Sequence, residues 1–157
     1  MTTKRWRVAV GGDIAGMGYK DMIRDDLEKD DRVAEVIDVG VTDETAETTR
    51  YPSVAHRAAE LVASGKADRA ILVCGTGIGM AVSANQVPGV WATPAHDSYS
   101  VERSILSNNC QVLTLGQRVI GRELARRLVK EWIGYEFDPA SHSSANLAVI
   151  EEYEPDL

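Results

Sequence analysis

The sequence has few cysteines and no long apolar run. Only Cys74 and Cys110 occur among 157 residues. Two cysteines are too few for a disulfide framework, which favours a reducing compartment. The apolar runs fall far short of the ~20 residues that a membrane helix needs, and no basic-then-apolar leader opens the chain. We therefore predict a cytoplasmic protein with no membrane partner.

Positive charge is also scarce. The chain has 17 Lys and Arg against 24 Asp and Glu, a formal net charge of −7. A nucleic-acid-binding surface needs a basic face, so no nucleic-acid partner is predicted. With 44% hydrophobic and 26% charged residues, the composition is that of one globular domain, predicted to span residues 1–157. A chain of this length can hold a core without a disulfide or a metal.

The standard cofactor and nucleophile motifs are missing as well. Counting from Gly75, the third glycine of a GxGxxG dinucleotide fingerprint would fall on Met80, and no glycine loop continues into the Gly-Lys-Ser/Thr of a P-loop. The GxSxG elbow of α/β-hydrolases is absent. The three histidines, His56, His96 and His142, lack the spacing of metal ligands. We predict no cofactor and no metal.

What the sequence does contain is an alternation of strand-like and helix-like segments. Short apolar runs predict strands, and apolar residues at helical spacing among charges predict helices. This alternation is typical of βαβ units with right-handed crossovers. We predict an α/β fold, a three-layer Rossmann-like doubly wound sheet of five mainly parallel strands in the order 2-1-3-4-5. The expected strands are 7–10, 33–39, 70–74, 90–93 and 112–115, and the expected helices are 19–27, 52–64, 80–87, 97–107, 120–132 and 147–153.

In that strand order the switch point lies between the first and third strands, and ligands bind there, beyond the carboxyl ends of the strands. Segments 11–14 and 74–79 therefore converge. The glycines of the second segment expose backbone N–H groups where a helix begins, which is the geometry of an anion site.

Three side chains near this point each have two interpretations. Cys74 immediately precedes the exposed N–H groups, where thiolate is favoured, so it is a base or a nucleophile; alternatively it is a small buried residue that closes the strand. Asp13 is a functional carboxylate, or it forms a turn or caps the following helix. His96 precedes Asp97, a predicted helix cap, and is either structural or part of the site.

Four motifs together resemble the ribose-5-phosphate isomerase B family, which includes the galactose-6-phosphate isomerases of the LacA/LacB type. They are CGTGIGM at 74–80, ANQVPG at 84–89, HDSYSVER at 96–103 and LGQRVIG at 115–121. The resemblance covers nearly the whole chain. It implies a Rossmann-like fold, homodimers or tetramers with sites at the subunit interface, and metal-free aldose–ketose isomerisation of sugar phosphates. It also implies that the C-terminal tail, 138–157, packs on a neighbouring subunit.

The resemblance assigns roles to individual residues. Cys74 matches the cysteine that moves a proton between C1 and C2, with Asp13 and Thr76 as further catalytic groups. Fixed N–H donors in the glycine loop suit an enediolate, because that intermediate is an oxyanion. Arg118 matches an arginine that helps to hold phosphate. The substrate-binding residues so implied are Gly75, Gly77, Ile78, Gly79, Tyr51, His96, Ser107, Asn108, Arg118, Ser141, His142 and Asn146.

The departures from the family pattern bear on the substrate. Ile14 and Ser107 stand where the family usually has histidines, the latter assigned to opening a furanose ring. Ser141 and Ala145 replace two arginines that reach the phosphate across the interface, and Arg50 replaces an aspartate that usually precedes Tyr-Pro. A tetrose 4-phosphate cannot close a furanose ring, because its 4-oxygen carries the phosphate. The pattern therefore looks like the branch that interconverts D-erythrulose 4-phosphate and D-erythrose 4-phosphate.

Two alternatives remain at this stage. One is an isomerase of a pentose or hexose phosphate, such as ribose 5-phosphate, whose ring opening uses His96 or water. The other is a non-catalytic sugar-phosphate-binding subunit of a heteromeric isomerase. The presence of Cys74 and the glycine loop argues against a binding subunit, because binding alone needs no base.

Overall fold

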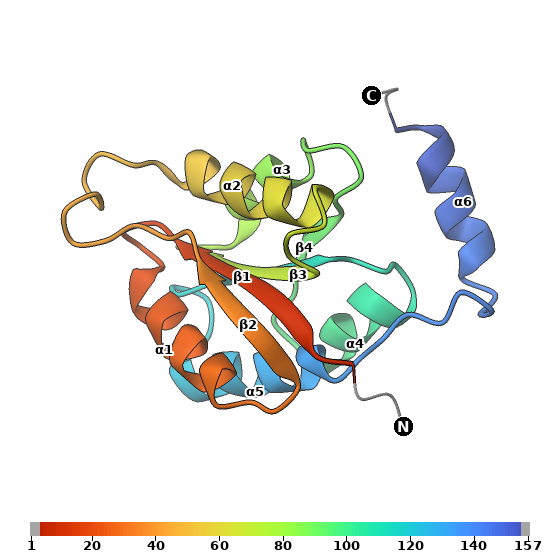
Figure 1. Ribbon diagram of the computed structural model, residues 1–157, viewed down its shortest axis with the longest axis horizontal. Helices are drawn as coiled ribbons and strands as arrows, with labels where there is room; N and C mark the ends of the chain where they lie inside the picture. Colours follow the sequence, from red (N-terminus) through yellow and green to blue (C-terminus); the bar gives the residue numbers. More distant parts are fainter. Residues whose placement is uncertain (1–3, 155–157) are drawn as a thin grey trace.

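The computed structural model describes residues 4–154 and has a five-stranded parallel sheet between two helical layers (Figure 1). Of the domain predicted over 1–157, residues 1–3 and 155–157 lie outside the described residues. The strands are β1 (Trp6–Gly12), β2 (Val33–Asp38), β3 (Arg69–Cys74), β4 (Ala92–Pro94) and β5 (Val112–Gly116). The helices are α1 (Met17–Glu28), α2 (Tyr51–Ala63), α3 (Ile78–Ala84), α4 (Ser98–Leu106), α5 (Arg122–Ile133) and α6 (Ser144–Glu152).

Each face of the sheet has its own apolar core. Helices α2 and α3 cover one face, and α1, α4 and α5 cover the other (Figure 1). Successive strand residues point to opposite faces, so Val8 lies in the cluster that contains Trp132 of α5, whereas Ala9 lies in the cluster that contains Val54 of α2. Because both faces are covered, β3 and β5 are buried along their whole length and are apolar almost throughout.

The predicted fold class is confirmed, but the predicted order of the last two strands is wrong. The observed order is 2-1-3-5-4, with β5 beside β3 and β4 at the edge. The two strands differ in what they can bury: β5 has five buried residues, whereas β4 has three residues and ends in the exposed Pro94. Proline has no N–H to donate to a ladder and is confined largely to edge strands. This signal was present in the sequence.

The switch point lies between β1 and β3, as predicted. These strands are neighbours, and the chain leaves them toward α1 on one face and α3 on the other. The turn after β1 presses against the end of β3 at Gly16, where a Cβ atom would lie 2.1 Å from the Val73 carbonyl oxygen. Only glycine permits this approach, so the two loops meet at the carboxyl end of the sheet.

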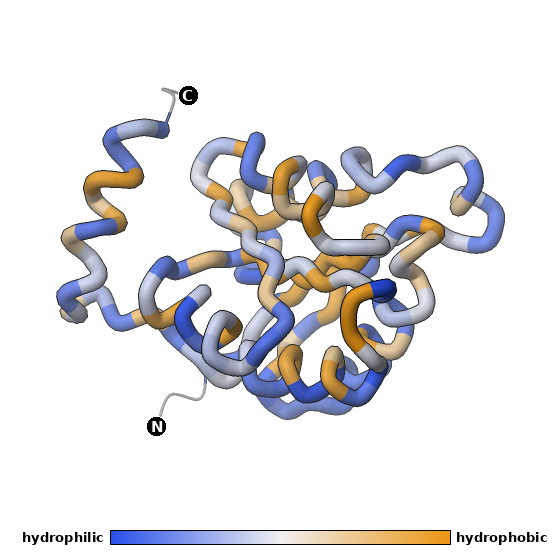
Figure 2. The backbone as a smooth tube through the Cα atoms, turned by 180° about the vertical axis from the view of Figure 1, so that it is seen from behind, coloured by the Kyte–Doolittle hydropathy of each residue, from blue (hydrophilic) through white to orange (hydrophobic). Residues whose placement is uncertain are grey.

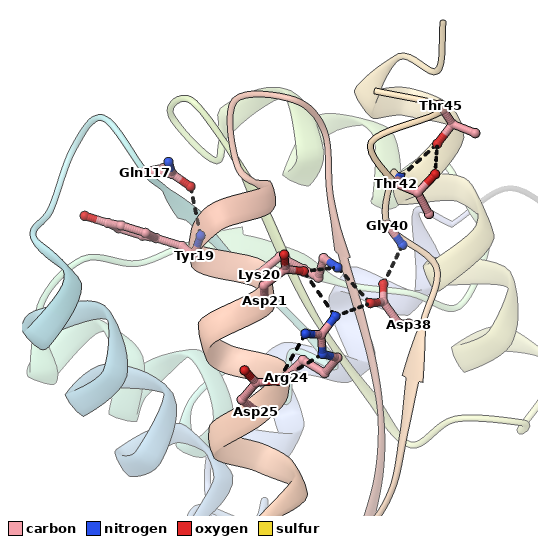
Figure 3. Close-up of polar contacts among 10 residues, drawn as sticks. All are labelled: Tyr19, Lys20, Asp21, Arg24, Asp25, Asp38, Gly40, Thr42, Thr45 and Gln117. Carbon is pink, nitrogen blue, oxygen red and sulfur yellow. Dashed lines mark hydrogen bonds and ion pairs between the residues drawn. The ribbon is translucent and has the colours of Figure 1, made fainter. Parts of the chain in front are cut away.

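An ion cluster around the buried Lys20, which the sequence analysis missed, joins α1 to the end of β2 (Figure 3). Lys20 is 3% exposed, and its Nζ lies 2.5 Å from Oδ1 of Asp21 and 2.7 Å from Oδ2 of Asp38. Asp38 also accepts a hydrogen bond from the Gly40 N–H at 2.9 Å. Burial raises the pKa of Asp38, but the hydrogen bonds from Lys20, Gly40 and Arg24 and the charge of Lys20 together outweigh burial, and the pKa lies below its usual value.

We expect Lys20→Met to lower the free energy of unfolding by roughly 1–3 kcal/mol near neutral pH, because Asp38 loses a charged hydrogen-bond donor. A carboxylate with a lowered folded pKa contributes stability above its unfolded pKa, about 3.9, and this contribution is lost as pH falls through the folded value. The difference between wild type and variant should therefore shrink in urea titrations at about pH 3. Lys29→Met, at an exposed position, is the matched control. An equal difference at both pH values would contradict this account.

Helix α6 lies at the side of the molecule (Figure 1). It contacts the segment before β4, because Trp91 Nε1 donates to the Glu154 carboxylate just beyond the helix, and Trp91 and Ile150 line one cavity. Figure 2 shows apolar residues along this helix. Its Leu147 is buried, but Val149 is 50% exposed and Tyr153, just beyond its end, is 84% exposed. Within residues 4–154, none of the helices combines the length and the apolar character required to span a bilayer.

Candidate active site

The glycine loop, residues 75–79, connects the buried strand β3 to α3. Gly77 caps α3 with a φ of +80°, in the left-handed region, and a Cβ there would lie 3.0 Å from the backbone of Leu115. Both the dihedral angle and the close approach require glycine. Within the described chain, the N–H groups of Gly75, Thr76, Gly79 and Met80 have no acceptor. The loop therefore presents a set of unused donors to anything bound above it.

Cys74 ends β3 directly beneath these donors. Its side chain is 5% exposed, and it belongs to the apolar cluster under α2 and α3. Its Sγ accepts a hydrogen bond from the N–H of Gly77 at 3.1 Å. A fixed N–H donor stabilises negative charge on sulfur. Cys74 is thus buried, as one of the two interpretations predicted, and its sulfur is held at the loop by a donor. Its role as a base or nucleophile stays a prediction.

Thr76 is exposed at the centre of the loop. Its Oγ1 accepts a hydrogen bond from the Ile78 N–H at 3.2 Å. A hydroxyl group that accepts in this way still has its own proton to donate. Thr76 can therefore add a side-chain donor to the backbone donors of the glycine loop.

Asp13 lies across the switch point, in the turn after β1. Its Oδ1 accepts from the N–H groups of Ala15 and Gly16 at 3.0 and 3.1 Å, so this oxygen shapes the turn, as one of the two interpretations predicted. The other oxygen has no partner in the region that the structure describes. Ile14 follows it and is 54% exposed. One carboxylate oxygen thus builds the loop and the other remains available to a ligand.

Tyr51 and Arg118 flank the glycine loop. Tyr51 begins α2, and its ring packs on Gly79, where a Cβ would lie 2.6 Å from the ring. Arg118 follows β5; its N–H donates to the Gly75 carbonyl at 3.0 Å, and its Nη1 lies 3.4 Å from the position of a Gly75 Cβ. The loop therefore has an aromatic side chain on one side and a cation on the other.

His96 comes after the edge strand β4, and its Nε2 accepts a hydrogen bond from the N–H of Gly116 at 2.9 Å. Burial lowers the pKa of His96, the neighbouring Asp97 raises it by less, and the net shift is downward. Nε2 is thus occupied within the protein. Asp97 caps α4, as predicted, by accepting from the Ser100 N–H at 2.7 Å.

The remaining predicted residues lie far from Cys74 within one chain. Ser107 and Asn108 precede β5, and the carbonyl of nearby Gln111 accepts from Ala70 at the start of β3. Because Cys74 ends that strand four residues later at about 3.3 Å per residue, these two residues lie at the opposite, amino end of the sheet. Ser141, His142 and Asn146 belong to the segment that follows α5 and includes the start of α6. Just beyond α6, Glu154 accepts a hydrogen bond from Trp91, which precedes β4 at the amino end of the sheet.

Cavity size does not identify the site. A cavity of about 1020 Å³ lies between the end of α1 and α5, lined by charged residues such as Asp26 and Arg126. It belongs to the amino end of the sheet, and its facing charges pair with each other, with Arg126 Nε 2.8 Å from Asp26 Oδ2. A second cavity, of about 480 Å³, lies beside β4 and includes Asn108. Neither cavity includes Cys74.

One residue that connects the loops was assigned no role from sequence. Gln117 follows β5, and its Oε1 accepts from the N–H of Tyr19 in α1 at 2.9 Å (Figure 3). The residue occurs within the LGQRVIG motif, but its partner is distant in sequence. It links the turn after β5 to the helix that follows the Asp13 turn.

The fold and this site define a doubly wound α/β protein that places a cysteine next to oxyanion-stabilising donors, an arrangement suited to proton transfer beside a developing negative charge. Comparison with known proteins gives the family. Residues 8–150 match the model described as Ribose/Galactose Isomerase, and the chain belongs to this family. The prediction of a sugar-phosphate isomerase is confirmed, and its substrate is a phosphorylated sugar.

Individual relatives agree with this assignment. The chain is 60% identical to D-erythrulose-4-phosphate isomerase 2 of Mycolicibacterium smegmatis over 94% of its length and 97% of the relative. It is 44% identical to D-erythrulose-4-phosphate isomerase of Pectobacterium atrosepticum, over 83% and 84% of the two chains. Its fold matches ribose-5-phosphate isomerase B of Clostridium thermocellum with a TM-score of 0.85 and 37% identity, covering 93% and 95% of the two chains.

Proposed function

We propose that this isomerase interconverts D-erythrulose 4-phosphate and D-erythrose 4-phosphate. The similarity to the M. smegmatis enzyme of that name supports the choice of sugar. The side chains support it independently: Ile14 and Ser107 cannot act as acid or base. A ribose 5-phosphate isomerase must first open a furanose ring, whereas a tetrose 4-phosphate has no free oxygen with which to close one.

Cys74 is the proposed base, and its hydrogen bond from Gly77 is the observation that carries the mechanism. The thiolate removes a proton from C1 of the ketose, and the electron pair of that C–H bond forms the C1=C2 double bond. The charge moves to O2 as an enediolate. The thiol then returns the proton to C2 while the O1 proton is lost and a proton is delivered to O2. One hydrogen has moved between carbons, one has moved between oxygens, and no electrons have left the substrate.

The other groups have distinct roles in this proposal. The unused N–H donors of the glycine loop and the Thr76 hydroxyl stabilise the charge on the enediolate without reorganising. The free oxygen of Asp13 receives a substrate hydroxyl, and Arg118 supplies positive charge for the phosphate. These groups account for the proton transfer, so the proposal includes no metal and no cofactor.

A homodimer is proposed because one chain cannot assemble all the predicted site residues. Ser107, Asn108 and the tail lie at the end of the sheet opposite Cys74, so they reach a glycine loop only in a second copy. Ile78 and Val82 on α3 are both 59% exposed beside that loop. An apolar surface next to a polar site is typical of an interface. The exposed apolar residues of α6 provide a second surface for the same contact.

Parallel assays test the proposed substrate. Erythrulose 4-phosphate, ribose 5-phosphate and galactose 6-phosphate are supplied to the same enzyme preparation, and kcat/KM is measured for each. The proposal expects the tetrulose phosphate to exceed the other two by a large margin. Equal efficiency with ribose 5-phosphate would reject the proposed substrate and leave the isomerase assignment intact.

We expect deletion of the chain from Ser141 onward to raise KM by about tenfold or more, equivalent to at least about 1.4 kcal/mol of substrate binding. The tail is proposed to supply polar contacts to the phosphate in the neighbouring site, through His142 and Asn146 among others. Sedimentation of the intact enzyme should show a dimer. His142→Ala in the full-length chain separates the loss of a contact from the loss of the helix. An unchanged KM after deletion, or an intact enzyme that sediments as a monomer, would contradict this prediction.

A further inference from the structure

We propose that His96 is a positioning residue, which holds the glycine loop and Cys74 in place through the backbone N–H of Gly116. The hydrogen bond lies within the protein. Only its effect on catalysis rests on the proposed function, in which the glycine loop stabilises the enediolate. We assign His96 no contact with substrate.

The imidazole ring takes the place of a missing strand residue. Strand β4 pairs with β5 up to Pro94 and Thr114, and the chain then turns away to begin α4. Two residues further along, Gly116 would have no neighbouring strand to accept its N–H. His96 Nε2 accepts that N–H at 2.9 Å, which extends the connection between the two strands by one more rung.

Gly116 and its neighbours contact the glycine loop at three points and Cys74 at a fourth. The Thr114 Oγ1 donates to the Gly77 carbonyl at 2.7 Å. The backbone of Gly116 packs on Thr76 so closely that a Cβ would lie 2.7 Å from the Thr76 Cα. The next two N–H groups, of residues 117 and 118, donate to the carbonyls of residues 74 and 75 at 2.9 and 3.0 Å. The position of Gly116 therefore fixes the base and the donors together.

The same turn also reaches the other side of the switch point. Gln117 Oε1 accepts from the Tyr19 N–H at the start of α1, the helix that follows the Asp13 turn. A shift of Gly116 would thus be transmitted to both loops of the site. Displacements of about 1 Å in a reacting group can cost ~10²-fold in rate, so one side-chain acceptor at this position has a large effect.

Only a neutral imidazole can accept at Nε2, since both ring nitrogens donate in the protonated form. The charged groups of the two segments that meet here are Asp97, beside the ring, and Arg118, on the turn that the ring holds; Cys74 lies beyond Gly116 on β3. Burial keeps the pKa of His96 below its usual value. Protonation at acidic pH would replace the accepting nitrogen with a donor facing the Gly116 N–H, and the bond would be lost.

Two substitutions separate positioning from the alternatives. His96→Phe keeps a ring but has no acceptor, and we expect kcat to fall about 10- to 100-fold while KM changes less than threefold. His96→Gln retains an acceptor oxygen, and we expect it to recover most of kcat. If the histidine were an acid–base catalyst, the glutamine variant would be as impaired as the phenylalanine variant. If it were merely structural, both variants would lose stability and keep kcat per folded molecule.

The pH dependence gives a further readout, and an NMR measurement needs no substrate. Wild-type kcat should fall on the acidic side of the usual imidazole pKa as His96 protonates, and His96→Gln should lack this decline. The amide resonance of Gly116 in the wild-type enzyme should titrate with the same midpoint as the His96 ring. A Gly116 amide that does not follow the ring overturns the inference. If the enzyme does not act on erythrulose 4-phosphate, the proposed function is wrong. The NMR titration still tests the hydrogen bond between His96 and Gly116, because it needs no substrate.

Discussion

Cys74→Ser should lower kcat by ~10²–10⁴-fold, the loss typical of removing a general base. The serine hydroxyl has nearly the same size and can also accept the Gly77 N–H, so the fold and the substrate affinity should be preserved. What changes is the acid–base chemistry, because a hydroxyl is far harder to ionise than a thiol. Steady-state kinetics give kcat and KM, and circular dichroism reports on the fold.

The second cysteine is the matched control. Cys110 is buried near the amino end of the sheet, far from the glycine loop, and burial raises its pKa to about 11. Cys110→Ser should lower kcat far less than Cys74→Ser, because Cys110 is not adjacent to the N–H donors of the glycine loop and its raised pKa disfavours the thiolate that a base requires. Wild-type turnover by Cys74→Ser would refute the assignment of the base.

Ser107→His should raise kcat for ribose 5-phosphate more than kcat for erythrulose 4-phosphate. The substitution restores an acid–base group where the family pattern has one. A positioned acid or base contributes up to ~10²–10⁴-fold, and a single histidine without supporting contacts should gain less. The tetrulose phosphate has no ring to open and should not benefit. KM for ribose 5-phosphate should remain high, because Ser141 and Ala145 carry no positive charge.

Ser107→Gln separates this effect from a change in shape. Glutamine has a volume similar to that of histidine and does not titrate, so it should give no gain with ribose 5-phosphate. The double variant with Ile14→His tests whether both missing groups are needed. Equal changes in kcat for the two sugars, or an equal gain from glutamine, would contradict this prediction. Ile14 and Ser107 would then not indicate a substrate that needs no ring opening.

Several features of the site could be predicted from sequence because they follow from local rules. The alternation of strands and helices predicts parallel pairing, and parallel pairing places the carboxyl ends of β1 and β3 at the same end of the sheet. Asp13 and Cys74 could therefore be brought together without a structure. Asp97 could be predicted as a cap, since capping involves only the next three residues.

Contacts between distant residues could not be predicted in this way. The partners of His96, Lys20 and Gln117 lie 20, 18 and 98 positions away in the sequence, and no periodicity or motif specifies them. These bonds arise only after the sheet has set the relative positions of the strand ends. For the same reason, His96 could be predicted to lie near the site, but its partner could not.

The sequence by itself determined the fold class, the glycine loop with its cysteine, and the family. The tertiary structure decided which strand occupies the edge. All of β5 is buried, so its backbone N–H and C=O groups need a strand partner on each side, whereas the short β4, which ends in Pro94, can lie at the edge. The tertiary structure also decided that Ser107, Asn108 and the tail lie at the end of the sheet opposite Cys74, because α4 and α5 each run back antiparallel to the strands. The spacing of residues along the chain does not specify the end of the sheet at which a residue lies. The direction in which each helix packs against the strands determines this position.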